Sequence, residues 1–414
     1  MLLRVVDYVG NPGGGVRFIV EAVTALAHLS DAPRIEMVSD GRAFATYESM
    51  FRDKCPNVTM RRVRPPNNPR TLMDWWYDKF PGMTIAQLLV RVILRGGDWY
   101  SLLRFDVPEE VTHGADAVWL PWIHGHRVMG DHRRVVATYH DTISIDFPGV
   151  LPRWMHGRVK ELETAWCKSA ARITVTSNAT AQSLERIYQV PRSHFRVIRL
   201  SAIHHQGDCR AIPAAMEGPW QSSPYLLCPA NTSLHKNHEV LLSGYARWGA
   251  SMPLVLTGSG TDFLLRSRST PRARQLRSLV RKLKLDQNRI IGLGYISDDR
   301  YFAILKNCHA LVMPTLAEGG GSFPVAEAVQ ARIPVICSDI PVMREAMDVY
   351  GGSPLWFDPD DPQALAIALE DLDKNYTTWQ QVAQSCETVS SRSWADVARD
   401  YLPLFQQVSL AAAI

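Results

Sequence analysis

The chain has 414 residues, with 45 basic and 41 acidic side chains and a formal net charge of +4 at pH 7. This length is enough for two or three domains, and 46% hydrophobic with 21% charged residues excludes a disordered or fibrous protein. So small a net charge does not indicate a general affinity for nucleic acid, and no nucleic-acid partner is expected. Since the sequence shows no apolar run of about 18 residues and no signal peptide, we expect a cytoplasmic protein without a transmembrane helix.

Cysteines are scattered along the chain rather than grouped. Their spacing fits neither a disulfide framework nor a zinc site of the CxxC type. We therefore expect buried free thiols. The seven positions are Cys55, Cys167, Cys209, Cys228, Cys308, Cys337 and Cys386.

Short apolar runs alternate with amphipathic stretches along most of the chain. In the first half, strands are predicted at 2–9, 135–141 and 171–178, and helices at 18–29, 153–168 and 179–189. In the second half, strands are predicted at 225–231, 253–260 and 309–315, each followed by a helical pattern. Apolar strands that alternate with helices predict parallel sheets covered on both faces.

Two such series are separated by residues 200–224, which are rich in Pro, Gly and Ser and show no periodicity. We read this segment as a linker between two Rossmann-like α/β domains whose parallel sheets face across a cleft. The predicted bounds are 1–205 for the N-terminal domain, 220–390 for the C-terminal domain and 391–414 for a final helix.

Two candidate site segments follow strands of the first series. GNPGGGVRF places Gly14 and Gly15 at the start of a helix, where they either let a phosphate approach the backbone or simply form a tight turn. VVATYHD places His140 at a strand end, where its imidazole either hydrogen-bonds a sugar or phosphate or has a structural role.

In the second series, Lys236 lies between a strand and a helix in LCPANTSLHKNHEVLL. A lysine at the mouth of a parallel sheet is a point cation suited to a phosphate, and the alternative is a solvated loop lysine.

The most informative segment is HALVMPTLAEGGGSFPVAEAVQARIPVICSDIP, at 309–341. Pro324 fits the first turn of a helix, on which we also expect Glu327, and Glu318 precedes the glycines. Backbone N–H groups at a helix start form an anion cradle, while carboxylates beside it suit the hydroxyls of a sugar and a ribose. A nucleotide diphosphate sugar offers all three groups; a glycine-rich turn with capping glutamates is the alternative. The predicted cradle consists of Gly320, Gly321, Ser322 and Phe323.

Basic side chains concentrate at 266–284, which holds eight of them and no acid. The stretch is either a solvated helix face or a peripheral contact with the anionic inner face of a membrane. Residues 83–104 mix apolar and basic positions and leave a similar choice between a packed helix and an acceptor or membrane surface.

Taken together, these segments resemble the retaining nucleotide-sugar glycosyltransferases of family 4, which have the two-Rossmann GT-B fold. The landmarks occur in family order: the glycine loop, TYHD, TVTSNAT, LHKNH, LVLTGSG, LGYISDD, PTLAEGGGSFPVAEA and PVICSDIP. The resemblance covers nearly the whole chain, and it implies that the final helix crosses back to the first domain.

The resemblance also implies roles for individual residues. Glu318 and Glu327 match the two glutamates of the family's EX7E motif, the first against the donor sugar and the second on the nucleotide ribose. Lys236 matches the diphosphate lysine, and His140 matches the histidine that faces the donor sugar. The backbone amides of the cradle match the phosphate-and-sugar loop.

Gly14 and Gly15 match the amino-terminal loop that closes on the phosphates. Two departures from the family pattern stand out. Eight residues rather than seven separate the glutamates, and Ala230 stands where some members have a second diphosphate-binding arginine.

The implied activity is transfer of a hexosyl group, with retention, from a nucleotide diphosphate sugar to a hydroxyl of a glycan or lipid-linked glycan. Neither a cofactor nor a metal is expected, because Lys236 and backbone amides face the diphosphate. A sugar-nucleotide epimerase of the same fold and a catalytically silent partner subunit remain alternatives. The base, the sugar and the acceptor do not follow from the sequence.

Overall fold

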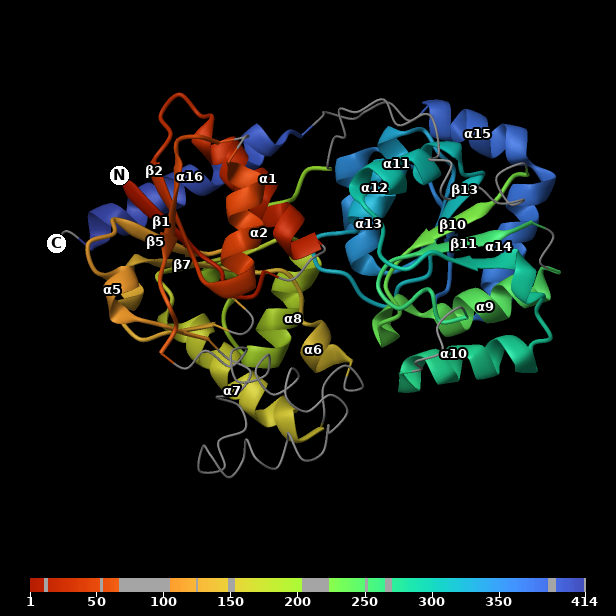
Figure 1. Cartoon of the computed structure of the whole chain (residues 1–414), viewed down its shortest axis with the longest axis horizontal. Coiled ribbons are helices and arrows are strands. Elements are labelled where there is room, and N and C mark those ends of the chain that lie inside the picture. The colour runs from red at the N-terminus through yellow and green to blue at the C-terminus, as the bar shows by residue number, and fades with distance from the viewer. Residues whose placement is uncertain are drawn as a thin grey trace. The chain divides into compact units, whose positions relative to one another are not determined.

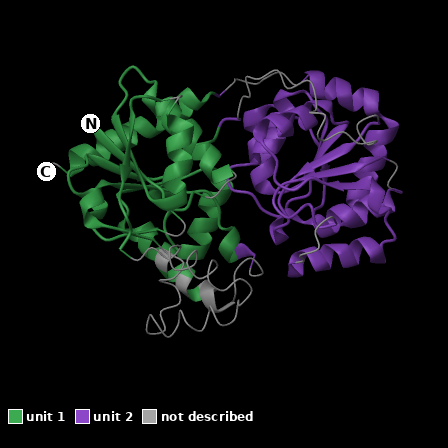
Figure 2. Cartoon of the chain, in the orientation of Figure 1, with its two compact units in different colours: residues 1–145, 151–200, 393–414 green, residues 146–150, 201–392 purple. Residues whose placement is uncertain are grey.

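A computed structural model describes most of the chain and divides it into two compact α/β units, coloured separately in Figure 2. Unit 1 comprises Met1–Ile145, Leu151–Leu200 and Ser393–Ile414, and unit 2 comprises Asp146–Val150 and Ser201–Arg392. The described residues are 1–10, 14–52, 55–66, 105–123, 126–147, 153–202, 223–249, 252–264, 270–385 and 392–412. Residues 83–104 lie outside these ranges.

Unit 1 is built on a parallel seven-stranded sheet with the strand order β3-β2-β1-β5-β7-β8-β9. The strands are β1 (Leu2–Val6), β2 (Arg34–Ser39), β3 (Val58–Arg62), β5 (Ala117–Leu120), β7 (Val135–Tyr139), β8 (Arg172–Val175) and β9 (Phe195–Val197). A separate parallel pair joins β4 (Phe105–Val107) to β6 (His126–Val128). The helices are α1 (Gly14–Ala27), α2 (Gly41–Phe51), α5 (Glu109–Thr112), α6 (Ile143–Asp146), α7 (Arg153–Ser169) and α8 (Asn178–Tyr188) (Figure 1).

Unit 2 has a parallel six-stranded sheet with the order β12-β11-β10-β13-β14-β15. The strands are β10 (Leu226–Pro229), β11 (Leu254–Thr257), β12 (Ile290–Gly292), β13 (Ala310–Met313), β14 (Val335–Ser338) and β15 (Leu355–Phe357). The helices are α9 (His238–Arg247), α10 (Pro271–Lys282), α11 (Asp298–Asn307), α12 (Phe323–Gln330), α13 (Pro341–Tyr350), α14 (Pro362–Lys374) and α15 (Tyr376–Ser385).

Five inner strands of the two sheets are buried along their whole length. Every residue of β5, β7, β11, β13 and β14 is buried, as expected for parallel strands covered by helices on both faces. The two parallel-sheet domains predicted from the alternation of strands and helices are therefore confirmed. The described cysteines are buried free thiols, as predicted: Cys55, Cys167, Cys228, Cys308 and Cys337.

The last helix, α16 (Trp394–Ala411), belongs to unit 1 although unit 2 precedes it in the sequence. It begins at Ser393, whose side chain forms a capping box with Asp396. Trp119 of β5 packs against two rings of this helix, with ring centroids 4.7 Å from Tyr401 and 5.6 Å from Phe405. The helix thus completes the apolar covering of the first sheet. Among the helices of the described ranges, none combines the length and the apolarity that a membrane span requires.

Helices α9 and α14 of unit 2 pack closely at Gly244, which has no side chain to separate their backbones. A Cβ atom built on Gly244 of α9 would lie 2.8 Å from Cδ2 and 2.9 Å from Cβ of Leu365 in α14. The Cβ of Leu365 moves only with its backbone, so a larger residue at 244 would push the two helices apart.

We therefore expect Gly244→Ala to destabilise unit 2 by about 1–3 kcal/mol, the usual cost of overpacking. The matched control is Gly157→Ala in α7, where a Cβ would meet nothing within 4 Å. That control should instead gain about 0.5–1 kcal/mol, because alanine favours the helix. Denaturant unfolding of the three proteins measures both effects, and an unchanged unfolding midpoint for Gly244→Ala would contradict the packing argument.

Candidate functional site

The strand order reverses at one point in each sheet, between β1 and β5 in unit 1 and between β10 and β13 in unit 2. Ligands of doubly wound sheets bind outside the carboxyl ends of the strands at such a point. Gly14 and Gly15 lie in the connection after β1, whereas Lys236 follows β10 and Glu318 follows β13. The predicted residues therefore gather at the reversal point of each sheet, with His140 one strand away, directly after β7.

Lys236 is held by a tightly bonded loop in unit 2. It ends the short 3-10 turn Leu234–Lys236, and the next residue, Asn237, takes the left-handed conformation with φ 55° before α9 begins. The side-chain amide of Asn237 donates to the carbonyl of Pro359 at 2.8 Å. The carbonyl of His235 accepts the N–H of Leu316 at 2.7 Å, which ties this loop to the loop after β13.

The two loops meet in an ion pair between Lys236 and Glu318, with Nζ 2.5 Å from Oε1. Their side chains are only 17% and 11% exposed. Separate roles were expected for the two residues, and the structure shows that they pair directly. A cation and a carboxylate that neutralise each other are thus available at the carboxyl ends of neighbouring strands.

Two histidines beside Lys236 carry no charge at neutral pH. Burial, and then the positive Lys236, lower the pKa of His235 to about 4. The pKa of His238 is also lowered to about 4, by burial first and then by the positive Arg272. The imidazoles therefore add no positive charge next to Lys236 at neutral pH.

The glycine-rich loop after Glu318 packs tightly against α13. Gly321 has φ +99°, a conformation that L side chains rarely adopt. A Cβ there would lie 2.7 Å from the Cβ of Ala346 and 2.9 Å from the hydroxyl of Tyr350. Helix α12 begins at Phe323 with Pro324 in its first turn, as predicted, so the predicted cradle lies at the positive end of the helix dipole.

Glu327 lies deeper in α12 than expected. We predicted it on the first turn, but the helix already begins at Phe323, so Glu327 is its fifth residue, and its exposed fraction is only 2%. Its Oε2 accepts a hydrogen bond of 2.6 Å from the hydroxyl of Tyr301 in α11. Sequence reasoning missed Tyr301, because no spacing rule connects it to Glu327.

Tyr350, at the end of α13, is a second residue that the sequence did not indicate. Burial, followed by the negative charges of Glu318 and Glu327, holds the pKa of its hydroxyl well above the usual range. The phenol therefore stays protonated next to the glycine loop and close to both carboxylates.

His140 is packed between aromatic rings in unit 1 and is 6% exposed. Its Nε2 donates to the carbonyl of Pro121 at 2.8 Å, so this nitrogen carries the proton. The ring stacks on Trp122, with centroids 4.6 Å apart and planes at 21°, and meets the edge of Phe18 at the same distance. The predicted histidine lies at the carboxyl end of its strand, in a fixed orientation.

Trp122 links His140 to the glycine loop. A Cβ on Gly15 would approach Cε3 of Trp122 to 3.2 Å, so the tryptophan lies against the start of α1. Gly14, the first residue of that helix, is exposed. Sequence reasoning missed Trp122 too, although an aromatic residue two positions after a buried strand could have drawn attention to it.

Asp7 fixes the entry to the same loop. Its carboxylate accepts the N–H groups of Val9 (3.0 Å) and Gly10 (2.9 Å) and the hydroxyl of Tyr47 (2.6 Å). Gly10 has φ +50°, and a Cβ there would lie 2.5 Å from the Cβ of Ala43. The chain therefore leaves β1 in one defined direction.

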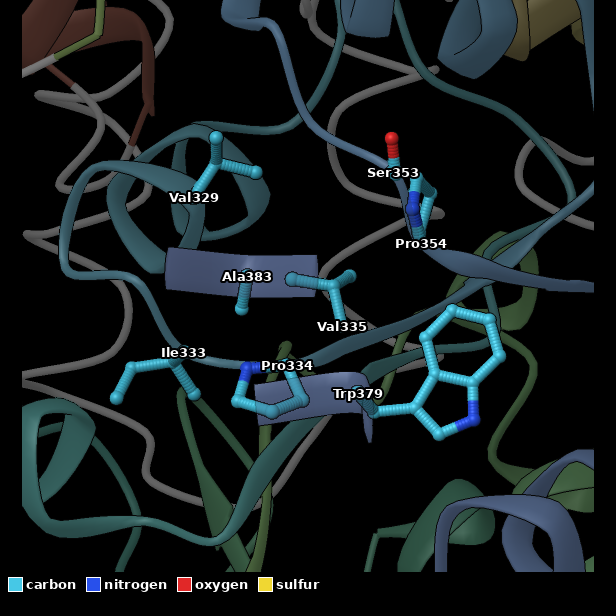
Figure 3. Close-up of a pocket in the computed structure, with 8 residues that line it drawn as sticks. All are labelled: Val329, Ile333, Pro334, Val335, Ser353, Pro354, Trp379 and Ala383. Carbon is cyan, nitrogen blue, oxygen red and sulfur yellow. The ribbon is translucent and has the colours of Figure 1, made fainter. Parts of the chain in front are cut away.

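A small apolar hollow in unit 2 is separate from these residues (Figure 3). It lies at the amino end of β14, near Pro334 and Val335, and Trp379 of α15 forms one wall. It has room for about one water molecule and so does not suit a sugar or a nucleotide. Its lining residues are Val329, Ile333, Pro334, Val335, Ser353, Pro354, Trp379 and Ala383.

Comparison with known proteins agrees with this geometry. The family model for glycosyltransferase family 4 matches residues 12–200, and the model for glycosyl transferases group 1 matches residues 217–386. Together the two models span most of both units.

Similar sequences include two O-antigen mannosyltransferases. The O-antigen chain mannosyltransferase RfbU of Salmonella typhimurium is 28% identical over 36% of this chain and 38% of its own length. O-antigen chain mannosyltransferase B of Escherichia coli is 23% identical over 63% of this chain and 67% of its own length. The match thus spans little more than a third of the Salmonella protein.

Among solved structures, Alr3699/HepE of Anabaena, crystallised with UDP and glucose, has a TM-score of 0.65 at 14% sequence identity. The superposition covers 98% of this chain and all of the other. This similarity supports the fold, and the two family models identify the sequence. The chain therefore belongs to glycosyltransferase family 4 and has the GT-B fold.

Proposed function

We propose that the chain is a retaining glycosyltransferase that moves a hexosyl group from a nucleotide diphosphate sugar to a hydroxyl of a glycan or lipid-linked glycan. The observation that carries the proposal is the pairing of Lys236 with Glu318 at the point where the second sheet reverses, beside the start of α12. The names of the similar mannosyltransferases favour polysaccharide or lipopolysaccharide synthesis as the process.

The ion pair explains how a donor would be received. A diphosphate carries more negative charge than one carboxylate, so it competes with Glu318 for Lys236 and gains the amides of Gly320–Phe323 and the dipole of α12. Glu318 then turns to a hydroxyl of the sugar. In this proposal Glu327 binds the ribose, and the donor contacts of Gly14, Gly15 and His140 stay predictions from the sequence.

The proposed reaction is a substitution on one face of the sugar. The bond from C1 to the diphosphate oxygen breaks, the bond from C1 to the acceptor oxygen forms, and the acceptor proton passes to the departing phosphate. Lys236 and the backbone amides stabilise the charge that develops on the diphosphate, which is the role a divalent cation has in other transferases. The proposal therefore needs no metal.

Incubation with a panel of UDP-, GDP- and ADP-sugars, in EDTA, tests the reaction. We expect slow release of nucleoside diphosphate from one donor, and NMR of the product formed with an added glycan acceptor should show the anomeric configuration of the donor. Loss of activity in EDTA that magnesium or manganese restores would overturn the metal-free mechanism. Conversion of the donor at C2 without release of nucleoside diphosphate would favour the epimerase alternative, and no turnover of any donor would favour a silent subunit.

The two glutamates are expected to respond differently to substitution. Glu327→Ala should weaken nucleoside diphosphate binding about 10- to 150-fold, since it removes a buried, charged hydrogen-bond acceptor for the ribose. Glu318→Ala should leave this affinity unchanged or raise it, because Lys236 no longer has to leave a carboxylate, but turnover should fall.

Calorimetry with nucleoside diphosphate and initial rates with intact donor measure the two effects. Glu370→Ala is the matched control, because Glu370 forms only an exposed ion pair with Lys374 on α14. If Glu318→Ala loses the affinity and Glu327→Ala keeps it, the proposed roles are reversed.

We also propose peripheral contact with an anionic membrane through α10 and the residues that follow it. Arg281, Lys282 and Lys284 are exposed there, and a basic side chain near an anionic surface contributes about 1 kcal/mol. Replacement of all three by glutamate should abolish co-sedimentation with anionic liposomes at low salt, whereas neutral liposomes should bind neither protein. Equal binding of both proteins to anionic liposomes would exclude this surface.

A further inference from the structure

Tyr301 is a buried phenol whose hydroxyl points at a proposed ribose-binding carboxylate. It lies on the first turn of α11, its exposed fraction is 6%, and its hydroxyl donates to Oε2 of Glu327 at 2.6 Å. The bond joins two helices that follow different strands, since α11 comes after β12 and α12 after β13. It therefore fixes the carboxylate from outside its own helix.

A carboxylate in this position needs such a partner. Glu327 is 2% exposed, and burying a charged group is costly unless it is hydrogen-bonded. A glutamate side chain also has three rotatable bonds, so an unrestrained carboxylate would lose conformational entropy each time it met a ligand. A fixed donor on one oxygen removes part of this loss in advance.

Tyr301 is itself well anchored. Its N–H donates to the carbonyl of Ser297 at 2.9 Å, and its ring lies 5.1 Å from that of Phe302. The hydroxyl of Tyr225, just before β10, donates to the carbonyl of Ile304 at 2.7 Å and fastens α11 to the sheet. The phenol is thus held by a rigid helix rather than by a loop.

We propose that Tyr301 is a positioning residue that orients the carboxylate of Glu327 for the ribose hydroxyls of the donor nucleotide. The inference rests on the proposed function, because it takes Glu327 to be the ribose ligand. Oε2 of Glu327 accepts the phenol, and this bond holds the carboxylate group in one orientation. In this proposal Tyr301 acts on affinity through Glu327 and not by a contact of its own with the sugar or the diphosphate.

The test compares Tyr301→Phe with the native chain in calorimetric titrations with UDP, GDP and ADP, each alongside its 2′,3′-dideoxyribose analogue. The phenylalanine keeps the buried ring and removes only the hydroxyl. We expect the variant to bind the ribose form about tenfold more weakly, because the cost of immobilising one flexible side chain on binding is then no longer met in advance. The dideoxy form, which offers Glu327 no hydroxyl, should bind within about twofold of its affinity for the native chain.

Tyr225→Phe is the matched control. It also deletes one hydroxyl that anchors α11, but that hydroxyl does not contact Glu327. We expect it to change the affinity for the ribose and dideoxy forms by the same factor. If Tyr301→Phe also weakens both forms equally, its effect is structural and the inference is wrong.

Two further outcomes distinguish failure of the positioning role from failure of the proposed function. If Glu327→Ala weakens nucleotide binding but Tyr301→Phe does not, the proposed function stands and the positioning role falls. If the native chain binds none of UDP, GDP and ADP, the proposed function fails, and the inference with it. Should Tyr301→Phe not fold, Tyr301→His keeps a polar aromatic ring whose N–H groups end short of the phenol oxygen, so the bond to Glu327 is still lost. Weakening confined to the ribose form then supports the role, and equal weakening of both forms refutes it.

Discussion

All strands of a parallel sheet end at the same edge, and this constraint decides where the chemistry of the chain lies. In each unit the connections leave that edge on both sides of one reversal point, so the loops on either side of it become neighbours. Lys236 and Glu318 are 82 positions apart in the sequence, yet they form an ion pair because β10 and β13 are adjacent. The site therefore depends on strand order more than on any single loop.

The ion pair between Lys236 and Glu318 adds little to the stability of the fold, but a negatively charged ligand can take the place of Glu318 in it. Two charges removed from water lose hydration that their attraction only partly replaces, and removing one partner leaves the other uncompensated. A ligand that brings its own negative charge can replace Glu318 without leaving Lys236 bare. The tight loops around the pair, tied by the bonds of His235 and Asn237, hold the lysine in place during such an exchange.

Local features of the fold could be predicted, because a buried strand appears in the sequence as an apolar run and a helix start can be indicated by a proline. The apolar run at 225–231 contains β10, and Pro324 marks the start of α12. Glu327 lies just beyond the first turn on which it was expected, since the chain becomes helical at Phe323, one residue before the proline. The partners of the site residues could not be predicted: Tyr301 reaches Glu327 from another helix, and Trp122 lies between His140 and Gly15 only because the loops after β1, β5 and β7 converge.

The position of α16 has a consequence for synthesis on the ribosome. Unit 2 is nearly continuous in sequence, so it can finish folding as soon as residue 392 has emerged. Unit 1 cannot, because the face of its sheet around Trp119 and Thr138 is covered by Tyr401 and Phe405, which are made after unit 2. Part of the apolar surface of unit 1 therefore stays uncovered until α16 has been made, while unit 2 can already fold. This order is the reverse of the usual one, in which the amino-terminal domain folds first.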